Sequence, residues 1–368
     1  MRKVLLMIHR LLQGGGTETH VRLLAKKLVQ EGYQVGVFTS GGPWTPSLQK
    51  AGIRIHMADG DIGERLRLLR QIVVRERYTL LHAHDGSSCR LAAAVKGPQR
   101  AVVMTIHGTY MFDGETQQAA RKADAVIAVS EDIAAAVQHA GIRRERLHLI
   151  YNGISTHTFH PARTGRLRRT QHIPGDAFVI GYAGRFTYAK EELGRKIVRA
   201  LYPYVAANPG VYMLVAGRNS LETLRTRHGR IRICGHVDDM GSFYRSCNVV
   251  IGTGRVALEA AATGTPTVAV GEMKWVGRLH AANLDAAARS NFGDHGHRYK
   301  AWHRGQLLQA IKDIASDSRQ AETDALRLSR HIARHYSAGQ MCRQVIRVYH
   351  QVDTRKRSGR SVRTKTQV

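Results

Sequence analysis

The sequence lacks any apolar run of about 18 residues, the length that a helix needs to cross a bilayer. Cysteine is also scarce, with four residues and no C-x-x-C pair. Because disulfide frameworks and zinc ribbons need paired cysteines, we expect reduced thiols in the core of a cytosolic protein. The apolar start at residues 4–8 is cut by His9 and Arg10 and is followed by no cleavage site, so it predicts a first strand rather than a signal peptide.

Acidic residues are scarce relative to basic ones: 28 Asp and Glu stand against 56 Lys and Arg, a formal net charge of +28. Such a surface favours anionic partners, among them nucleic acid, acidic lipid headgroups and phosphorylated small molecules. Residues 353–368 are basic and lack apolar periodicity, so we predict a disordered tail, either simply solvated or attracted to an anionic membrane. Nucleic acid is the less favoured partner, because aromatics make up only 6% of the chain and no RNP, helix-turn-helix or zinc-finger signature is present.

Strand and helix patterns alternate from the first residue. A buried strand over residues 4–8 is followed by three glycines and by apolar residues at 21, 24, 25 and 28, which form one face of a helix. Such βαβ units build parallel sheets with right-handed crossovers. Further strands are predicted at residues 34–39, 80–83, 101–106, 125–129, 147–150, 178–182, 211–215, 231–234, 249–251 and 267–270. The predicted class is therefore α/β, with two doubly wound, Rossmann-like parallel sheets.

The length of 368 residues fits two domains of about 150 residues each. The strand–helix rhythm breaks over residues 161–176, a stretch with Pro, Gly and a basic cluster that we interpret as the linker. We predict one domain over residues 1–165 and a second over 166–335. A helix over residues 336–352 and the basic tail from 353 complete the chain.

Two glycine-rich turns each follow a predicted strand and lead into a helix. They read G-Y-A-G-R-F-T-Y-A-K over residues 181–190 and G-T-G-R-V-A-L-E-A-A-A-T-G-T-P over residues 252–266. Glycine at such a turn lets backbone N–H groups approach an anion, and the helix N-terminus adds partial positive charge. Arg185 and Lys190 supply two cations, and Glu259 supplies an acceptor suited to a ribose hydroxyl. This combination suggests a nucleotide-sugar site, whose phosphate-facing residues would be Gly184, Gly252, Thr253, Gly254 and Arg255.

Six segments in this order resemble the GT-B glycosyltransferases of family 4, a large retaining group of nucleotide-sugar enzymes. The resemblance covers roughly residues 4–349. The segments are G-G-G-T-E-T-H-V (14–21), T-I-H-G (105–108), A-D-A-V-I-A-V-S-E (123–131), Y-N-G-I (151–154), Gly184-Arg185 with Lys190, and L-E-A with G-T-P (258–266).

The resemblance implies two facing domains, with the acceptor on the first, the nucleotide sugar on the second, and a C-terminal helix that crosses back to the first domain. It implies metal-independent transfer without a cofactor, in the synthesis of a cell-surface glycan, polysaccharide or glycolipid. The basic tail suggests a cytoplasmic protein that is peripheral at the inner membrane face, with a lipid-linked glycan as the acceptor. His107, Arg185 and Lys190 take the catalytic positions. Gly15 and Gly16 are expected to approach the sugar or its phosphates with their backbone N–H groups.

The sequence departs from the family pattern at two positions. A first glutamate, which in the family holds the donor sugar, is expected eight residues before Glu259, where this chain has Ile251. Glu272 is a candidate replacement. The glycine that commonly follows the clamp lysine is Glu191, whose carboxylate either weakens the charge of Lys190 or points away from it.

Three alternatives stay open at this stage. Ile251 is compatible with a degenerate GT-B protein that binds sugar nucleotides or a partner enzyme without transfer. A sugar-nucleotide epimerase of the same fold would need a cluster of carboxylates that is not evident, and a nucleic-acid-binding protein would use the basic surface alone. We predict no metal site, because the pairs His82/His84 and His295/His297 lack further converging ligands.

Overall fold

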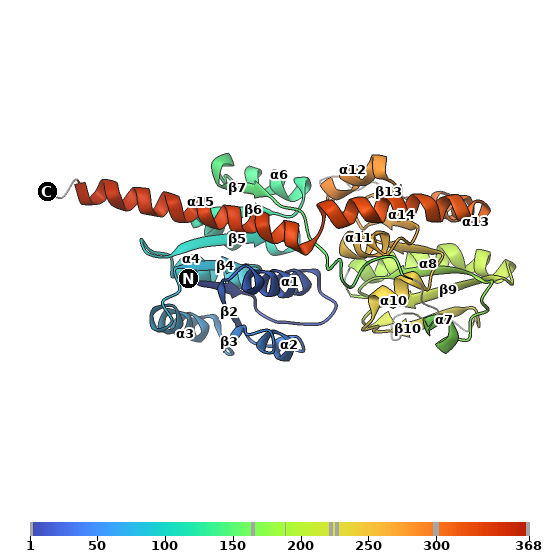
Figure 1. Ribbon diagram of the computed structural model, residues 1–368, viewed down its shortest axis with the longest axis horizontal. Helices are drawn as coiled ribbons and strands as arrows, with labels where there is room; N and C mark the ends of the chain where they lie inside the picture. Colours follow the sequence, from blue (N-terminus) through green and yellow to red (C-terminus); the bar gives the residue numbers. More distant parts are fainter. Residues whose placement is uncertain are drawn as a thin grey trace. The chain divides into compact units, whose positions relative to one another are not determined.

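The computed structural model of this chain describes residues 3–162, 166–187, 189–220, 224, 228–296 and 302–365. It divides into two compact units, Met1–Gly153 with Ala338–Val368, and Ile154–Ser337 (Figure 1). Each unit has its own sheet and its own hydrophobic core. The boundary between residues 153 and 154 lies before the boundary predicted at residues 165 and 166.

The first unit contains a seven-stranded sheet in the order β3-β2-β1-β4-β5-β6-β7. All of its pairings are parallel. The strands are β1 (Lys3–Met7), β2 (Gln34–Thr39), β3 (Arg54–Met57), β4 (Leu80–Ala83), β5 (Ala101–Ile106), β6 (Ala125–Ala128) and β7 (Leu147–Leu149). The strand order reverses between β1 and β4, and ligands of doubly wound sheets bind beyond the carboxyl ends of the strands at such a reversal.

Four helices of the first unit begin at side-chain caps. Side chains of Asp61, Asp85, Asp113 and Ser130 accept hydrogen bonds from the first turns of α3, α4, α5 and α6. The helices are α1 (Gly16–Gln30), α2 (Thr45–Gln49), α3 (Ile62–Arg75), α4 (Gly86–Ala94), α5 (Gly114–Lys122), α6 (Glu131–His139) and α15 (Ala338–Lys365), with 3-10 turns η1 (Thr109–Met111) and η2 (Arg144–Arg146).

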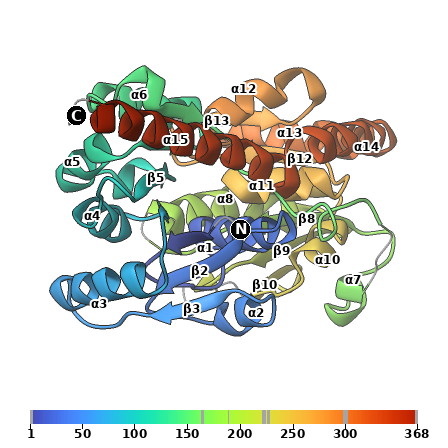
Figure 2. The same cartoon turned by 60° about the vertical axis from the view of Figure 1, so that its left-hand side comes forward.

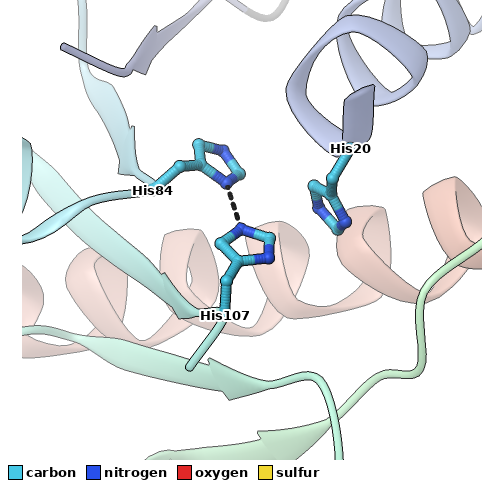
Figure 3. A group of neighbouring side chains, drawn as sticks. All are labelled: His20, His84 and His107. Atoms are coloured by element: carbon cyan, nitrogen blue, oxygen red, sulfur yellow. Dashed lines mark hydrogen bonds between the residues drawn. The ribbon is translucent and has the colours of Figure 1, made fainter. Parts of the chain in front are cut away.

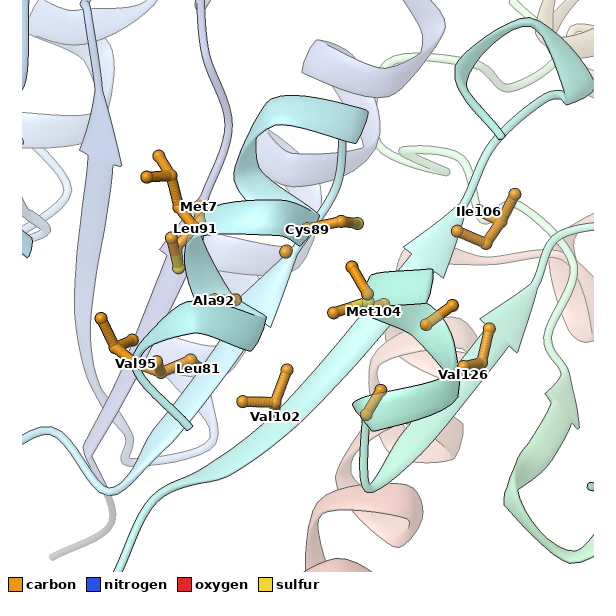
Figure 4. Packing of buried hydrophobic residues seen from close by; sticks show 14 of the residues in the cluster. Met7, Leu81, Cys89, Leu91, Ala92, Val95, Val102, Met104, Ile106 and Val126 are labelled. Carbon is orange, nitrogen blue, oxygen red and sulfur yellow. The ribbon is translucent and has the colours of Figure 1, made fainter. Parts of the chain in front are cut away.

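One face of this sheet packs against α3, α4, α5 and α6, which follow one another along one side of the unit (Figure 2). Met7, Leu81 and Met104 of the strands share a buried cluster with Cys89 and Leu91 of α4 (Figure 4). Burying one such apolar side chain contributes about 1.5–3 kcal/mol. This layer therefore fixes where the carboxyl ends of β1, β4 and β5 lie.

The other face of the sheet is covered by α1 and α15. Tyr349 of α15 anchors its helix, because its hydroxyl lies 2.6 Å from Nδ1 of His82 in β4. The buried apolar residues of α15 follow helical spacing: Ala338, Met341, Cys342, Val345, Val348, Tyr349 and Val352. The return of this helix to the N-terminal sheet is therefore built on apolar packing along one face.

The basic C-terminal segment differs from its prediction. We predicted disorder from residue 353, but α15 continues as a helix through Lys365. Arg355 donates to the carbonyl of Glu145, and Lys356 donates to the carbonyl of Gly97. The first part of α15 is already anchored by packing, and the tail continues the same helix. The periodicity within the tail alone does not reveal this continuation. Residues 366–368 lie outside the described part of the chain.

The second unit contains a six-stranded sheet in the order β10-β9-β8-β11-β12-β13. The strands are β8 (Phe178–Ala183), β9 (Val211–Ala216), β10 (Ile231–Gly235), β11 (Val249–Gly252), β12 (Thr267–Val270) and β13 (Trp275–Arg278). All pairings are parallel except that of β13, which joins β12 in the antiparallel sense. The predicted parallel sheet is thus confirmed apart from this edge strand.

Helices flank the second sheet as well, and α8, α13 and α14 contribute to its largest apolar cluster. The helices are α7 (Arg166–Thr170), α8 (Ala189–Ala207), α10 (Met240–Arg245), α11 (Gly254–Ala262), α12 (Leu284–Arg289), α13 (Arg304–Ser316) and α14 (Ser318–His335), with the 3-10 turn η3 (Ala281–Asn283).

The predicted linker, residues 161–176, belongs to the second unit. Arg168 on α7 donates from Nε to the carbonyl of Ser246 at 2.9 Å and from Nη2 to Oδ1 of Asn248 at 2.7 Å. The basic cluster that indicated a linker therefore includes a side chain that ties the segment to its sheet. Residues 163–165 lie outside the described part.

The composition predicts reduced cysteines and no membrane-spanning helix. Cys89, Cys234, Cys247 and Cys342 are free thiols, and all except Cys234 are buried. In the residues that the structure describes, no helix combines the length and the apolarity needed to span a membrane.

Candidate active site

The predicted site residues follow strand ends in both units. In the first unit, Gly15 precedes α1 and Gly16 is the first residue of that helix, and His107 comes directly after β5. In the second unit, Arg185 follows β8, and Gly254 follows β11 after one intervening residue. These positions lie at the carboxyl edges of the two sheets, the edge where doubly wound folds bind ligands.

The glycine turn after β1 has two separate needs for glycine. Gly14 has φ +78°, in the left-handed region that favours glycine. Gly15 precedes α1 as its N-cap, and a Cβ there would lie 1.8 Å from Oε2 of Glu18. A sugar or phosphate that approaches this turn therefore meets the carboxylate of Glu18 as well as backbone N–H groups.

His107 lies in a group of three buried histidines (Figure 3). Its Nε2 is 3.3 Å from Nδ1 of His84, the residue that follows β4. His20 on α1 joins them, with ring centroids 4.7 Å from His107 and 5.4 Å from His84. Nδ1 of His20 is 3.1 Å from Oδ1 of Asn152. Three segments far apart in sequence thus bring their imidazoles to one point.

Burial keeps the rings at this sheet edge neutral. Desolvation, with the neighbouring histidines adding to it, lowers the pKa of His84 well below the ordinary 6.5. The same causes lower the pKa of His82 in β4. Neutral imidazole can donate from one nitrogen and accept at the other, which suits a sugar hydroxyl or a metal ion.

His82 has a structural role. Its Nδ1 meets the Tyr349 hydroxyl at 2.6 Å, and its Nε2 meets Oγ1 of Thr105 at 2.7 Å. From the sequence we considered His82 and His84 together as a possible ligand pair. Only His84 joins the three-histidine group, so the two residues have separate roles. Of the second pair, His295 is buried and His297 lies outside the described residues.

The turn before α11 leaves the helix N-terminus without a side-chain cap. Thr253 is the N-cap, but its hydroxyl donates to the carbonyl of Phe292 at 3.0 Å and caps no N–H group. Gly254 has φ +54°, and a Cβ there would lie 3.2 Å from Nδ2 of Asn291. A Cβ on Gly252 would lie 2.3 Å from the side chain of Val256. The turn therefore combines close packing with backbone N–H groups that can bind an anion.

The two predicted clamp cations differ in their surroundings. Arg185 is exposed and forms no hydrogen bond or ion pair within the described part of the chain. Lys190 on α8 lies 2.5 Å from Oδ1 of Asp294 and 3.6 Å from Oε1 of Glu272. Burial raises the pKa of Glu272, whereas Lys190 and other cations hold that of Asp294 below its ordinary value despite its burial.

This pairing changes one argument from the sequence. A lysine at a helix N-terminus opposes the macrodipole, so the position of Lys190 by itself would suggest a bound anion beside it. In the structure Asp294 and Glu272 already supply that compensation. Glu191 does not weaken Lys190, because its carboxylate pairs with Arg195 one turn further along α8 at 2.8 Å.

Glu259 is buried on α11 and is held by protein groups. Its Oε1 lies 2.8 Å from Nη2 of Arg255, one turn earlier on the same helix. Its Oε2 accepts from the Tyr244 hydroxyl at 3.4 Å, and burial raises the pKa of that phenol well above its ordinary value. A buried carboxylate is costly without a partner, and Arg255, predicted to contact phosphate, is one of its partners here.

A strained turn presents Asp294 to this region. Asn291, Phe292 and Gly293 have φ of +47°, +57° and +88°, three consecutive residues in the left-handed region. The turn packs closely on Gly271, where a Cβ would lie 2.0 Å from the carbonyl of Gly293. Such strain persists only where the surroundings enforce it, and here it places a carboxylate beside Lys190.

The structure thus brings the second-unit candidates into one region around the start of α11 and groups His107 with two further histidines. Sequence reasoning missed His20, His84, Asn291 and Asp294. His20 was visible within the run G-G-G-T-E-T-H-V, and His84 was visible at the end of a predicted strand. No periodic signal marks a turn such as N-F-G-D, so Asp294 emerges only from the fold.

Two doubly wound sheets with these loops define a class of fold, the GT-B architecture. Solved structures of this architecture superpose along nearly the whole chain. HepE of Anabaena, solved in complex with UDP and glucose, aligns with a TM-score of 0.76 over 95% of this chain and 100% of that chain, at 20% identity. Sucrose-phosphate synthase of Thermosynechococcus elongatus aligns with a TM-score of 0.74 over 96% and 100%, at 18% identity.

The chain is a glycosyltransferase that belongs to family 4 in its N-terminal part and to the glycosyl transferases group 1 in its C-terminal part. The model of Glycosyltransferase Family 4 matches residues 14–158, and that of Glycosyl transferases group 1 matches residues 177–280. Among its relatives, the phosphatidyl-myo-inositol mannosyltransferase of Mycobacterium leprae is 25% identical, over 92% of this chain and 94% of the relative. The predicted family is confirmed.

Proposed function

We propose that this chain is a retaining, metal-independent glycosyltransferase that moves a hexose from a nucleoside diphosphate to an acceptor hydroxyl. The observation that carries the proposal is the turn before α11, where a helix N-terminus without a side-chain cap lies in the same unit as two cations, Arg185 and Lys190. A leaving diphosphate gains negative charge as the glycosidic bond breaks. Fixed donors and cations stabilise that charge without reorganisation, the effect that most often dominates catalysis.

The two cations divide the work. Arg185 is exposed and forms no close ion pair within the described residues, although its charge acts on Glu272 and Asp294 from a distance, so its guanidinium donors are open to the diphosphate. Lys190 is shared with Asp294 and Glu272, which hold its ammonium group in place. No metal ion is needed in this scheme to neutralise the leaving group, and no cofactor takes part.

The remaining predicted residues bind the donor. The N–H groups around Gly252 and Gly254 contact phosphate oxygens. Glu259 accepts from the ribose, with Arg255 and the Tyr244 hydroxyl fixing its orientation. In the first unit, His107 and the N–H groups of the Gly15–Gly16 turn contact the sugar.

The acceptor that we propose is a glycan or a lipid-linked molecule. The names of relatives support this class, since one is a phosphatidyl-myo-inositol mannosyltransferase and another, of Catenulispora acidiphila, is a D-inositol 3-phosphate glycosyltransferase, 26% identical over 69% of this chain and 74% of the relative. The net charge of +28 supports action at the anionic cytoplasmic face of a membrane.

Truncation after Lys356 tests whether the basic tail binds an anionic membrane. This end point keeps the contacts of Arg355 and Lys356 with the first unit. We expect weaker binding to vesicles of phosphatidylglycerol and phosphatidylcholine and unchanged binding to vesicles of phosphatidylcholine alone. Equal binding of the truncated and full chains to the anionic vesicles would remove the tail from the account.

Calorimetry separates the proposal from its main alternative, a degenerate protein that binds sugar nucleotides without transfer. The full chain is titrated in EDTA with UDP, GDP and ADP, and turnover of the matching sugar nucleotides is followed in the same buffer. Binding of one diphosphate together with turnover of its sugar nucleotide supports transfer. Binding without turnover across lipid-linked and soluble acceptors would favour the degenerate protein, for which Ile251 is the motivating residue.

A further inference from the structure

We propose that His20, His84 and His107 form a binding site for a zinc ion. One ring nitrogen of each residue lies within 4.8 Å of the others, and all three side chains are buried (Figure 3). Three histidines with an open fourth position are an established ligand set for zinc. The rings come from α1, from the end of β4 and from the end of β5, so the sheet itself holds the ligands in place.

The spacing of the nitrogens fits a tetrahedral ion. With Zn–N bonds of about 2.0–2.1 Å, two ligand nitrogens lie about 3.3 Å apart. Nδ1 of His84 and Nε2 of His107 are separated by 3.3 Å. Without a metal ion these two nitrogens share a hydrogen bond, which zinc would replace at nearly the same separation (Figure 3). The most widely separated ligand nitrogens need to close by at most about 1.5 Å, which small ring rotations accomplish.

The surroundings of the rings also fit a cation. Only neutral imidazole binds metal, and the burial of all three side chains disfavours their charged form. Oδ1 of Asn152 accepts from Nδ1 of His20, which leaves the lone pair of that ring on Nε2. This is the arrangement by which an outer partner fixes the tautomer of a metal-binding histidine.

Zinc at this site should inhibit glycosyl transfer, a consequence that rests on the proposed function. Zinc would occupy Nε2 of His107, the nitrogen of that ring nearest to His84. The same ring is proposed to contact the donor sugar. Transfer without metal and inhibition by zinc are therefore expected together, and a chelator should restore activity.

Binding is tested first, independently of activity. The full chain is purified without metal-affinity chromatography, stripped with a chelator and dialysed against zinc chloride, and bound zinc is counted by mass spectrometry. We expect one tightly bound ion per chain. His84→Gln and His107→Gln should each weaken its affinity on the order of 100-fold or more, and Asn152→Ala should weaken it roughly 10–100-fold.

A surface pair provides the matched control. His331 and His335 lie one turn apart on α14 with ring centroids 4.4 Å apart, a spacing that can also bind zinc. The double variant H331Q/H335Q should keep the tight site unchanged. Loss of the tight site in this double variant, or absence of tight binding to the full chain, would overturn the proposal.

X-ray absorption spectroscopy of the zinc-loaded, unmodified chain identifies the ligand atoms of the bound zinc. This measurement does not depend on whether the variants fold. We expect three imidazole nitrogen ligands and one oxygen ligand. A sulfur ligand would overturn the proposal. If zinc binds at the three histidines but does not inhibit an active transferase, the metal site stands and the sugar-binding role of His107 fails. If no donor is turned over at all, the binding results still decide the metal site.

Discussion

Replacing the two clamp cations separately should have unequal effects on folding. Arg185→Ala removes an exposed charge without a protein partner, so the free energy of unfolding should change by less than about 0.5 kcal/mol. Lys190→Met removes the charge that Asp294 meets at 2.5 Å and Glu272 at 3.6 Å, and keeps most of the side-chain volume. This second change leaves two largely buried carboxylates without their cation.

The magnitude follows from the burial of the pair. Removing one partner of a fully buried ion pair costs about 3–5 kcal/mol. The side chains of Lys190 and Asp294 are 23% and 18% exposed, so we expect the lower end, about 3 kcal/mol. For a unit of this size such a loss lowers the melting temperature by roughly 6–12 °C. Adding Asp294→Asn to Lys190→Met should recover part of that stability, because it removes the uncompensated charge.

Both variants should lose catalysis while differing in stability. Removing one group that stabilises developing charge costs about 10²–10³ in kcat, so each should reduce turnover by about that factor. Urea unfolding and initial rates of nucleoside diphosphate release give the two quantities. If Lys190→Met unfolds at the same urea concentration as the parent chain, the ion pair with Asp294 does not form in solution. If Arg185→Ala keeps full turnover, the clamp is wrong.

Three further predictions concern packing and protonation. Tyr349→Phe leaves a buried nitrogen of His82 without its hydroxyl partner, which should lower the free energy of unfolding by about 1–3 kcal/mol in urea titration; an unchanged midpoint would contradict this anchor of α15. Because the pKa values of His82 and His84 are lowered on folding, the unfolded chain binds more protons below about pH 6.5, and the free energy of unfolding should fall there by up to about 1.4 kcal/mol per pH unit for each ring and stay level above it; flat stability between pH 5 and 7 would contradict neutral burial. Gly254→Ala forces a left-handed φ on alanine and brings its Cβ to 3.2 Å from Asn291, so it should cost about 1–2 kcal/mol and weaken diphosphate binding in calorimetry, whereas unchanged binding would exclude this turn from the site.

Most of the fold was predictable because buried parallel strands are short apolar runs between helical patterns. Eleven predicted strands correspond to strands of the structure within about two residues at each end, the usual uncertainty of element boundaries. The two strands that were missed are β3 and β13, both at sheet edges. The burial pattern of β3 (Arg54–Met57) is mostly open, and β13 (Trp275–Arg278) carries a glycine with φ +88°. Edge strands are half-solvated and carry a weak apolar signal.

The site was predictable in part, for a different physical reason. Glycine turns, clamp cations and Glu259 stand next to strands along the sequence, so local patterns place them. The partners of these residues are not adjacent in sequence. Asp294 pairs with Lys190 across 104 residues, and His20 forms a hydrogen bond with Asn152 across 132 residues. Such pairs depend on tertiary packing alone. For the same reason the sequence suggested a bound anion beside Lys190, whereas the fold supplies two carboxylates.

The most direct test of the central claim is a donor screen of the purified full chain in EDTA, with a panel of sugar nucleotides and no acceptor, that measures release of the nucleoside diphosphate. The account predicts slow hydrolysis of one donor, which Arg185→Ala reduces by about 10²–10³. Neither binding nor hydrolysis with any donor would contradict the assignment of Arg185, Lys190 and Glu259 to a nucleotide-sugar site.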